Sequence, residues 1–237
     1  MFDKTKWIQC ESFEQLYKAA EILCKDSREV CYFWTVWNSM RSNVSLWIKN
    51  RMFNSYPDCI RAIERIWYGA ICSFKSSGIQ SGLVSSNAYK NGGMHDHCIS
   101  PQTVGGFVMD NHNRFLDNVV NPTFISEDGK VKGALKECYE VWTLCNITNY
   151  ITSDENKELK KLKRTMPTED KYTHLGIRLF NKKTKLPVEN YQPNLPEGYT
   201  QWEKDNVIDQ PISCNGTITY YPDIKSKSLS TAPPLPV

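Results

Sequence analysis

Three of the four histidines of the chain fall between positions 95 and 112, and the first two flank an aspartate in the segment His95-Asp96-His97. A neutral imidazole can take a proton from water near pH 7, and a carboxylate is a hard ligand suited to Mg²⁺. On a strand, alternation places His95 and His97 on one face and Asp96 on the other. Asp96 and His97 therefore need a bulge or a strand end to converge on one ion.

A second polar segment, residues 142–149, ends in Asn149. Directly after it, Thr152 and Glu155 have the spacing of a capping box, in which each side chain satisfies a backbone N–H at the start of a helix. The sequence therefore predicts a capped helix immediately behind this segment, and the helix carries several basic residues.

Together, the two segments resemble the HNH (ββα-metal) endonuclease family of the phage homing type. In that family the His of an Asp-His pair is the general base, the Asp binds a divalent metal, and the last His or Asn completes the metal site. The resemblance implies that His97 is the base and that Asp96 and Asn149 bind Mg²⁺ or another divalent cation. It also implies that the protein hydrolyses DNA phosphodiester bonds. The matching positions are Asp96-His97 with Pro101 and residues 142–149 and 152–156.

The chain departs from the family pattern at several positions. Glu140 stands where the family has a middle Asn that orients the base, and Asn118 and Asn121 are the alternatives within the long segment between the two motifs. The gap from His97 to Asn149 exceeds that of the compact motif, so the resemblance requires an inserted hairpin. No Cys-x-x-Cys occurs, so the structural zinc of some relatives has no local scaffold.

Other roles remain open for the same residues. His95 and His97 are equally typical of polar positions on an exposed strand, whereas His95, His97 and His112 together are a chemically possible site for Zn²⁺ or Fe²⁺. Cys98 is a candidate nucleophile, but no orienting third group is evident. Arg114 and His112 are candidates for an active-site role, but they are equally typical of a loop whose polar side chains are hydrogen-bonded within the fold.

Residues 157–185 form the most basic stretch of the chain, with ten Lys or Arg against three acids. Such a stretch is typical of a solvated helix face or of a contact to nucleic-acid phosphate. The second hypothesis for function is therefore a non-catalytic DNA-binding or structural phage accessory protein. The predicted DNA-binding residues are Lys160, Lys161, Lys163, Arg164, Lys182, Lys183 and Lys185.

The elements that must position these residues suggest three consecutive parts. Residues 1–80 are expected to form a helical region, with a capping box at Ser12 and Gln15, a helix over 29–54 that the polar patch 38–45 can interrupt, and aromatic side chains in the core. A Ser-, Gly- and Asn-rich stretch, residues 73–93, predicts loops and a boundary.

Residues 81–165 are expected to hold the HNH-like ββα nuclease core, with a hairpin turning at Asp128-Gly129. Residues 166–237 are expected to form an irregular, basic C-terminal arm with short strands and a flexible tail. The predicted fold class is therefore α+β.

The composition of the chain argues against several broad classes of protein. The net charge of +3 does not by itself indicate a polyanion partner, and 12% aromatic residues argue against wholesale disorder. No apolar run approaches the roughly 18 residues that a bilayer span requires, and no signal peptide is evident, so we expect a cytoplasmic protein with no membrane partner. Nine irregularly spaced cysteines are expected to be free thiols.

Overall fold

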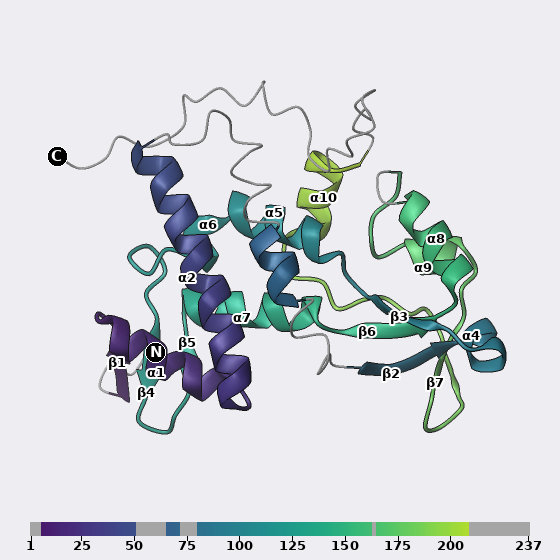
Figure 1. The fold of residues 1–237 in the computed structure, drawn as a ribbon, viewed down its shortest axis with the longest axis horizontal. Helices are drawn as coiled ribbons and strands as arrows, with labels where there is room; N and C mark the ends of the chain where they lie inside the picture. The colour runs from purple at the N-terminus through teal and green to yellow at the C-terminus, as the bar shows by residue number, and fades with distance from the viewer. Residues whose placement is uncertain (1–5, 51–64, 72–79, 163–164, 209–237) are drawn as a thin grey trace.

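The computed structural model describes residues 6–50, 65–71, 80–162 and 165–208, with side chains omitted over 45–50. The fold is α+β, as predicted, and it contains two hydrophobic clusters of very different size. The larger cluster lies among helices at one end of the molecule, and the smaller cluster lies against a mixed sheet at the other end (Figure 1).

The helical end is built on amphipathic helices that bury large aromatic side chains. Trp37, Trp67 and Trp142 are fully buried there, which confirms the prediction of Trp37 and Trp67 as core residues. Helix α1 begins at the predicted capping box, with the Ser12 and Gln15 side chains each bonded to the other's backbone. The principal helices are α1 (Phe13–Leu23), α2 (Ser27–Asn50), α5 (Pro101–Asp110), α6 (His112–Phe115), α7 (Ala134–Cys145) and α10 (Tyr199–Asn206), and residues 65–71 are also helical.

Helix α2 runs without interruption through the polar patch at 38–45. One face of the helix stays apolar across this patch, because Trp37, Met40 and Val44 follow each other at helical spacing and are buried. Burial of this face outweighs the weak helix propensity of the Asn and Ser residues beside it. Residues 51–64, which include the last four residues of the predicted helix over 29–54, lie outside the described residues.

A small sheet covers one end of the helices, with strand order β1 (Trp7–Gln9), β4 (Phe124–Ser126) and β5 (Val131–Lys132). Strands β4 and β5 form the predicted hairpin, and Gly129 takes the positive φ of 74° that its turn requires. The hairpin pairs with β1 and not with the strand that carries Asp96. It is therefore separate from the candidate site.

The candidate site lies in a five-stranded sheet at the other end of the molecule, with strand order β3 (Met94–His97), β6 (Thr148–Ile151), β2 (Gln80–Ser85), β7 (Leu179–Asn181) and β8 (Pro187–Val188). Strand β2 is the central strand, and helix α4 (Ser86–Asn91) follows it. The prediction of loops over 73–93 is therefore wrong for residues 80–91. Pairing with β6 and β7 on both sides outweighs the low strand propensity of Ser and Gly in β2.

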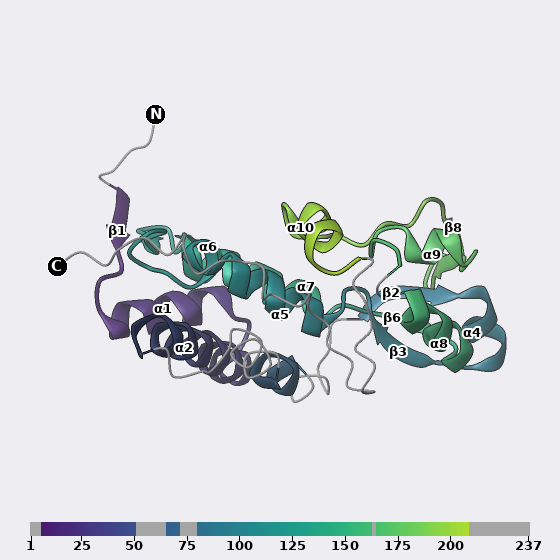
Figure 2. The same ribbon diagram turned by 90° about the horizontal axis from the view of Figure 1, so that it is seen from above.

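Each of the two hydrophobic clusters contains residues from more than one of the three consecutive parts expected from the sequence. Residues from 10 to 71, from 98 to 145 and from 199 to 207 share the larger cluster. The smaller cluster joins Ile151 of β6 to Leu159, Tyr172 and Leu179, with contributions from α8 (Ser153–Lys161) and α9 (Lys171–His174). Residues 166–208, expected to be an irregular arm with short strands, supply two short strands that belong to the five-stranded sheet, and α9 lies beside that sheet (Figure 2).

Candidate functional site

Asp96 and Asn149 lie directly opposite each other on neighbouring antiparallel strands, β3 and β6. Residues paired in this way project their side chains from the same face of a sheet. Helix α8 begins just after β6, and its start is the predicted capping box, because Thr152 and Glu155 each bond the other's backbone. The order strand, strand, helix therefore exists here, with helices α5, α6 and α7 and a hairpin inserted between its two strands.

His97 lies on the opposite face of the sheet from Asp96 and Asn149. The pairing of β3 with β6 is continuous over Met94–His97 with no bulge, so His97 faces the same side as its partner Thr148. The His97 Nδ1 lies 2.7 Å from the Cys145 carbonyl oxygen, and since a carbonyl only accepts, Nδ1 carries the proton. The structure thus brings together the two predicted ligands but not the predicted base.

Asn149 is fully buried, and its Oδ1 accepts a hydrogen bond from Ser81 Oγ at 2.7 Å. Burial raises the pKa of Tyr172 and of Tyr191, and the Asn149 amide acts on both hydroxyls in the opposite direction. A metal ion shared by Asp96 and Asn149 would use the second lone pair of the Asn149 Oδ1, beside the hydrogen bond from Ser81. Within the described ranges, no group of three or more His, Cys, Asp or Glu is arranged to hold a metal ion, so His95, His97 and His112 do not form a shared metal site.

Cys98 follows the Asp-His pair and is buried, and burial raises the pKa of its thiol to about 11. A thiol with this pKa is protonated near neutral pH, and only the thiolate is a strong nucleophile. The geometry therefore gives no support to a nucleophilic role for Cys98. The described cysteines are all free, as predicted.

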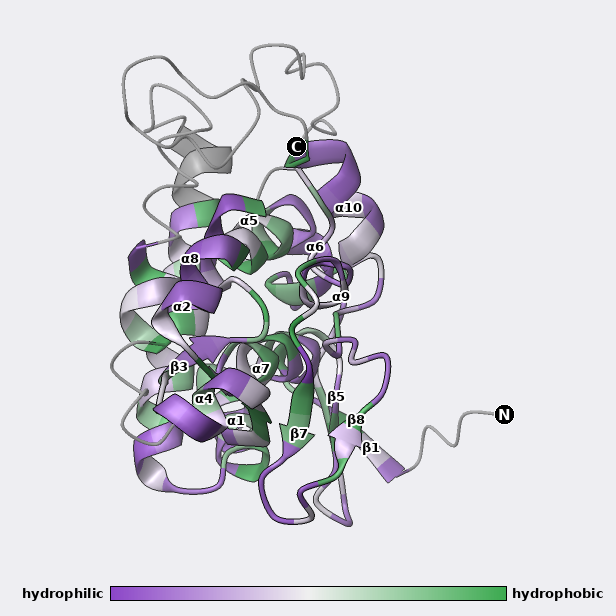
Figure 3. Cartoon of the chain, turned by 90° about the vertical axis from the view of Figure 1, so that its right-hand side faces the viewer, coloured by the Kyte–Doolittle hydropathy of each residue, from purple (hydrophilic) through white to green (hydrophobic). Residues whose placement is uncertain are grey.

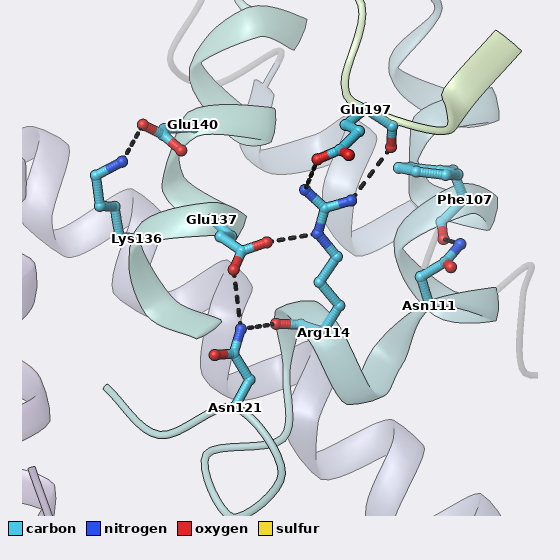
Figure 4. A network of polar contacts seen from close by, with 8 residues as sticks. All are labelled: Phe107, Asn111, Arg114, Asn121, Lys136, Glu137, Glu140 and Glu197. Atoms are coloured by element: carbon cyan, nitrogen blue, oxygen red, sulfur yellow. Dashed lines mark hydrogen bonds and ion pairs between the residues drawn. The ribbon is translucent and has the colours of Figure 1, made fainter. Parts of the chain in front are cut away.

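The polar residues between β3 and β6 form a network that holds helices together (Figure 4). Arg114 contacts the Glu137 carboxylate and the carboxylate and carbonyl of Glu197. Asn121 donates to the Arg114 carbonyl at 2.8 Å and to Glu137 at 3.0 Å. Asn118 bonds the backbone of Cys10 and Thr123.

Glu140, at the position of the family's middle Asn, is ion-paired with Lys136 and lies in the same view (Figure 4). Neither Glu140 nor Asn121 is directed to His97 by any of these contacts, and Arg114 is engaged by two carboxylates. We therefore assign structural roles to Arg114, Asn118 and Asn121, and His112 likewise lies 3.2 Å from the Met109 carbonyl within its own helical segment.

The predicted basic segment is divided between two places in the fold. On α8, Lys157 pairs with Asp154 and Lys161 pairs with Glu158. Lys160 is exposed on the same helix, whereas Lys163 and Arg164 lie outside the described residues. Two of the cations of α8 are therefore already ion-paired with acids one turn away.

Lys182, Lys183 and Lys185 occupy the turn between β7 and β8, which we call the lysine turn. All three side chains are exposed, and none takes part in an ion pair within the part of the chain that the structure describes. The turn is hydrophilic next to an apolar β7 (Figure 3).

The backbone of the lysine turn is fixed by its own sequence. Asn181 Oδ1 accepts from the backbone N–H groups of Lys183 and Thr184, at 2.9 and 3.1 Å, and Lys185 adopts a left-handed φ of 59°. The Lys182 N–H donates to the Gly82 carbonyl of β2 at 2.8 Å. Three cations are thus held at one end of the sheet on an ordered turn.

Several residues around the site escape an analysis of the sequence alone. Ser81, Tyr172 and Tyr191 surround Asn149, but they come from segments expected to be loop or arm. Tyr150 could have been identified from the sequence, because strand alternation places it on the face opposite its neighbour Asn149 in β6.

No family model matches the chain, and comparisons with curated proteins and with solved structures find no significant similarity. Function must therefore be argued from the geometry.

Proposed function

We propose that this protein binds the phosphate backbone of nucleic acid, with DNA as the partner, and that it does so without cleaving it. The observation that carries the proposal is the lysine turn, in which Lys182, Lys183 and Lys185 are exposed on an ordered backbone and form no ion pair with any residue that the structure describes. Side chains that are not already neutralised can release the counterions of a phosphate chain on binding.

Counterion release determines how steeply the affinity for DNA is expected to fall with salt concentration. Each neutralised phosphate makes log K fall with log salt by about 0.9 on duplex DNA, so three lysines contribute a slope of about −3. Lys160 on α8 adds at most one further contact. The α8 lysines that are paired with Asp154 and Glu158 contribute less, because an existing ion pair must be given up first.

The test is a fluorescence-anisotropy titration of a 20-base-pair duplex at several salt concentrations. The test variant replaces Lys182, Lys183 and Lys185 with Gln. The control variant removes the same charge at ion-paired lysines elsewhere, with the substitutions Lys136→Gln, Lys157→Gln and Lys161→Gln. The test variant is expected to lose up to about 3 units of slope and the control less than 1. Equal losses in the two variants, or no binding at low salt, contradict the proposal.

A second candidate is the Mg²⁺-dependent hydrolysis of DNA expected from the resemblance, with Asp96 and Asn149 as ligands and His97 as base. The observation that favours it is the pairing of Asp96 with Asn149 directly ahead of the capped helix α8. The position of His97 on the opposite face speaks against it. Supercoiled plasmid incubated with and without Mg²⁺ decides the matter, because cleavage that is lost in both Asp96→Asn and His97→Ala supports this candidate and overturns non-catalytic binding.

A further inference from the structure

The five-stranded sheet has a second face, opposite the smaller hydrophobic cluster. Pairing across the strands places His95, Tyr150, Val84 and Phe180 on this face in adjoining positions. Val84 is buried, whereas the three ring-bearing side chains around it are only partly buried. The face therefore presents a row of rings across neighbouring strands.

The ring of Tyr150 is held in place by its neighbours. Its hydroxyl accepts a hydrogen bond from the Gly93 N–H at 3.0 Å, and its ring centroid lies 5.2 Å from that of His95. His95 is in turn 3.3 Å from Thr148 Oγ1 through its Nδ1. Rings fixed in this way lose little side-chain entropy when a planar ligand stacks on them.

The same face leads to the lysine turn. Phe180 is followed two positions later by Lys182, the first residue of the turn, whose N–H is bonded to the Gly82 carbonyl of the central strand. Cations that can bind phosphate thus lie at the end of β7, the strand that carries the Phe180 ring. A surface of rings bordered by cations that pair with none of the described acids matches a ligand with planar bases and a negatively charged backbone.

We propose that this face, which we call the ring face and define by His95, Tyr150 and Phe180, binds single-stranded nucleic acid by stacking unpaired bases. The inference rests on the proposed function and narrows its substrate. Bases within a duplex are already stacked and cannot present their flat sides to a sheet, whereas unpaired bases can. A single strand therefore uses both the ring face and the lysine turn, and a duplex uses the lysine turn alone.

The test compares the affinity of the full chain for labelled dT20 and for a 20-base-pair duplex at one low salt concentration. The variants are Tyr150→Leu and Phe180→Leu, which remove a ring but retain apolar bulk. Tyr150→Phe retains the ring and removes only the acceptor for Gly93. The matched control is Phe13→Leu, because Phe13 is an exposed ring on α1 in the helical end of the molecule.

Loss of one stacked base is expected to weaken dT20 binding by between about 5-fold and 150-fold in each ring-face variant, with duplex affinity changed less than 2-fold. Tyr150→Phe and Phe13→Leu are expected to stay within about 3-fold of the wild type for dT20. Circular dichroism melting of each variant reports whether it is folded, and two ring positions guard against failure of one variant to fold.

The outcomes separate this inference from the function on which it rests. If both ring-face variants bind dT20 as the wild type does, while the lysine-turn variant loses salt dependence, the ring face is not a binding surface and the proposed function stands. If neither dT20 nor duplex binds at low salt, both are overturned. If ring-face variants lose single-strand and duplex binding equally, single-strand selectivity is overturned.

Discussion

Glu203 on α10 is a buried carboxylate whose removal should lower the stability of the fold. It is 2% exposed, its oxygens accept from the Thr168 N–H at 2.8 Å and the Thr168 hydroxyl at 2.6 Å, and Lys171 Nζ lies 3.8 Å away. Helix α10 belongs to the larger hydrophobic cluster, and Lys171 begins α9 beside the five-stranded sheet. The contacts of Glu203 therefore tie the two ends of the molecule together.

The expected loss in the free energy of unfolding on removal of the Glu203 carboxylate follows from these contacts. Hydrogen bonds to a charged group are worth about 1.5–3 kcal/mol each, and breaking a buried ion pair by removing one partner costs about 3–5 kcal/mol. Because the two contributions overlap, we expect Glu203→Ala to lower the free energy of unfolding by about 3–5 kcal/mol. Glu203→Gln retains an acceptor for the Thr168 N–H and should lose about half as much.

Urea denaturation followed by tryptophan fluorescence measures both variants. Asp205→Ala on the same helix is the control, because Asp205 is exposed and accepts a hydrogen bond from the Gln201 side chain of the same helix. A loss below 1 kcal/mol for Glu203→Ala would refute the reasoning, since the contacts of the buried carboxylate would then contribute almost nothing to stability. Equal losses for the Ala and Gln variants would also refute it, since the acceptor that Gln retains for the Thr168 N–H would then contribute nothing.

Two further predictions concern the sheet. A Cβ at Gly93 would lie 2.4 Å from the Ile151 carbonyl oxygen, so Gly93→Ala should destabilise the fold by about 1–3 kcal/mol in thermal unfolding, whereas Gly69→Ala, with open space around it in a helix, should be neutral or stabilising. Burial raises the pKa of Cys98 to about 11 in the fold, so the native state holds the proton more tightly than the unfolded chain does. The free energy of unfolding should therefore fall between about pH 9 and 11, by up to about 1.4 kcal/mol per pH unit for this thiol, and Cys98→Ala should make that decline shallower in pH-dependent denaturation.

The elements that could be predicted from the sequence are those with strong local signals. The capping boxes at Ser12 and Thr152 and the hairpin at Asp128-Gly129 each satisfy backbone groups within a few residues, and all are present. Strand β2 was missed because its Ser- and Gly-rich sequence becomes a strand only through pairing with β6 and β7, which are distant in the chain.

The candidate site was predictable only in part for the same reason. Alternation correctly separates His97 from Asp96, but the partner strand that aligns Asn149 with Asp96 is set by long-range pairing. The pairing of Lys157 and Lys161 on α8 with acids one turn away is a local pattern that the sequence contains. The absence of an ion pair between the lysine turn and any described residue, in contrast, depends on what lies near the turn in the fold. No helix within the described ranges is long and apolar enough to cross a membrane.

The most direct test of nucleic-acid binding is footprinting of lysines by acetylation and mass spectrometry, with and without DNA. We predict that saturating DNA slows the acetylation of Lys182, Lys183 and Lys185 severalfold, because a lysine in contact with phosphate is shielded from the reagent. Lys136, on α7 in the helical end, should react at the same rate in both samples. Unchanged reactivity of the lysine turn in a sample where anisotropy shows bound DNA would contradict the account.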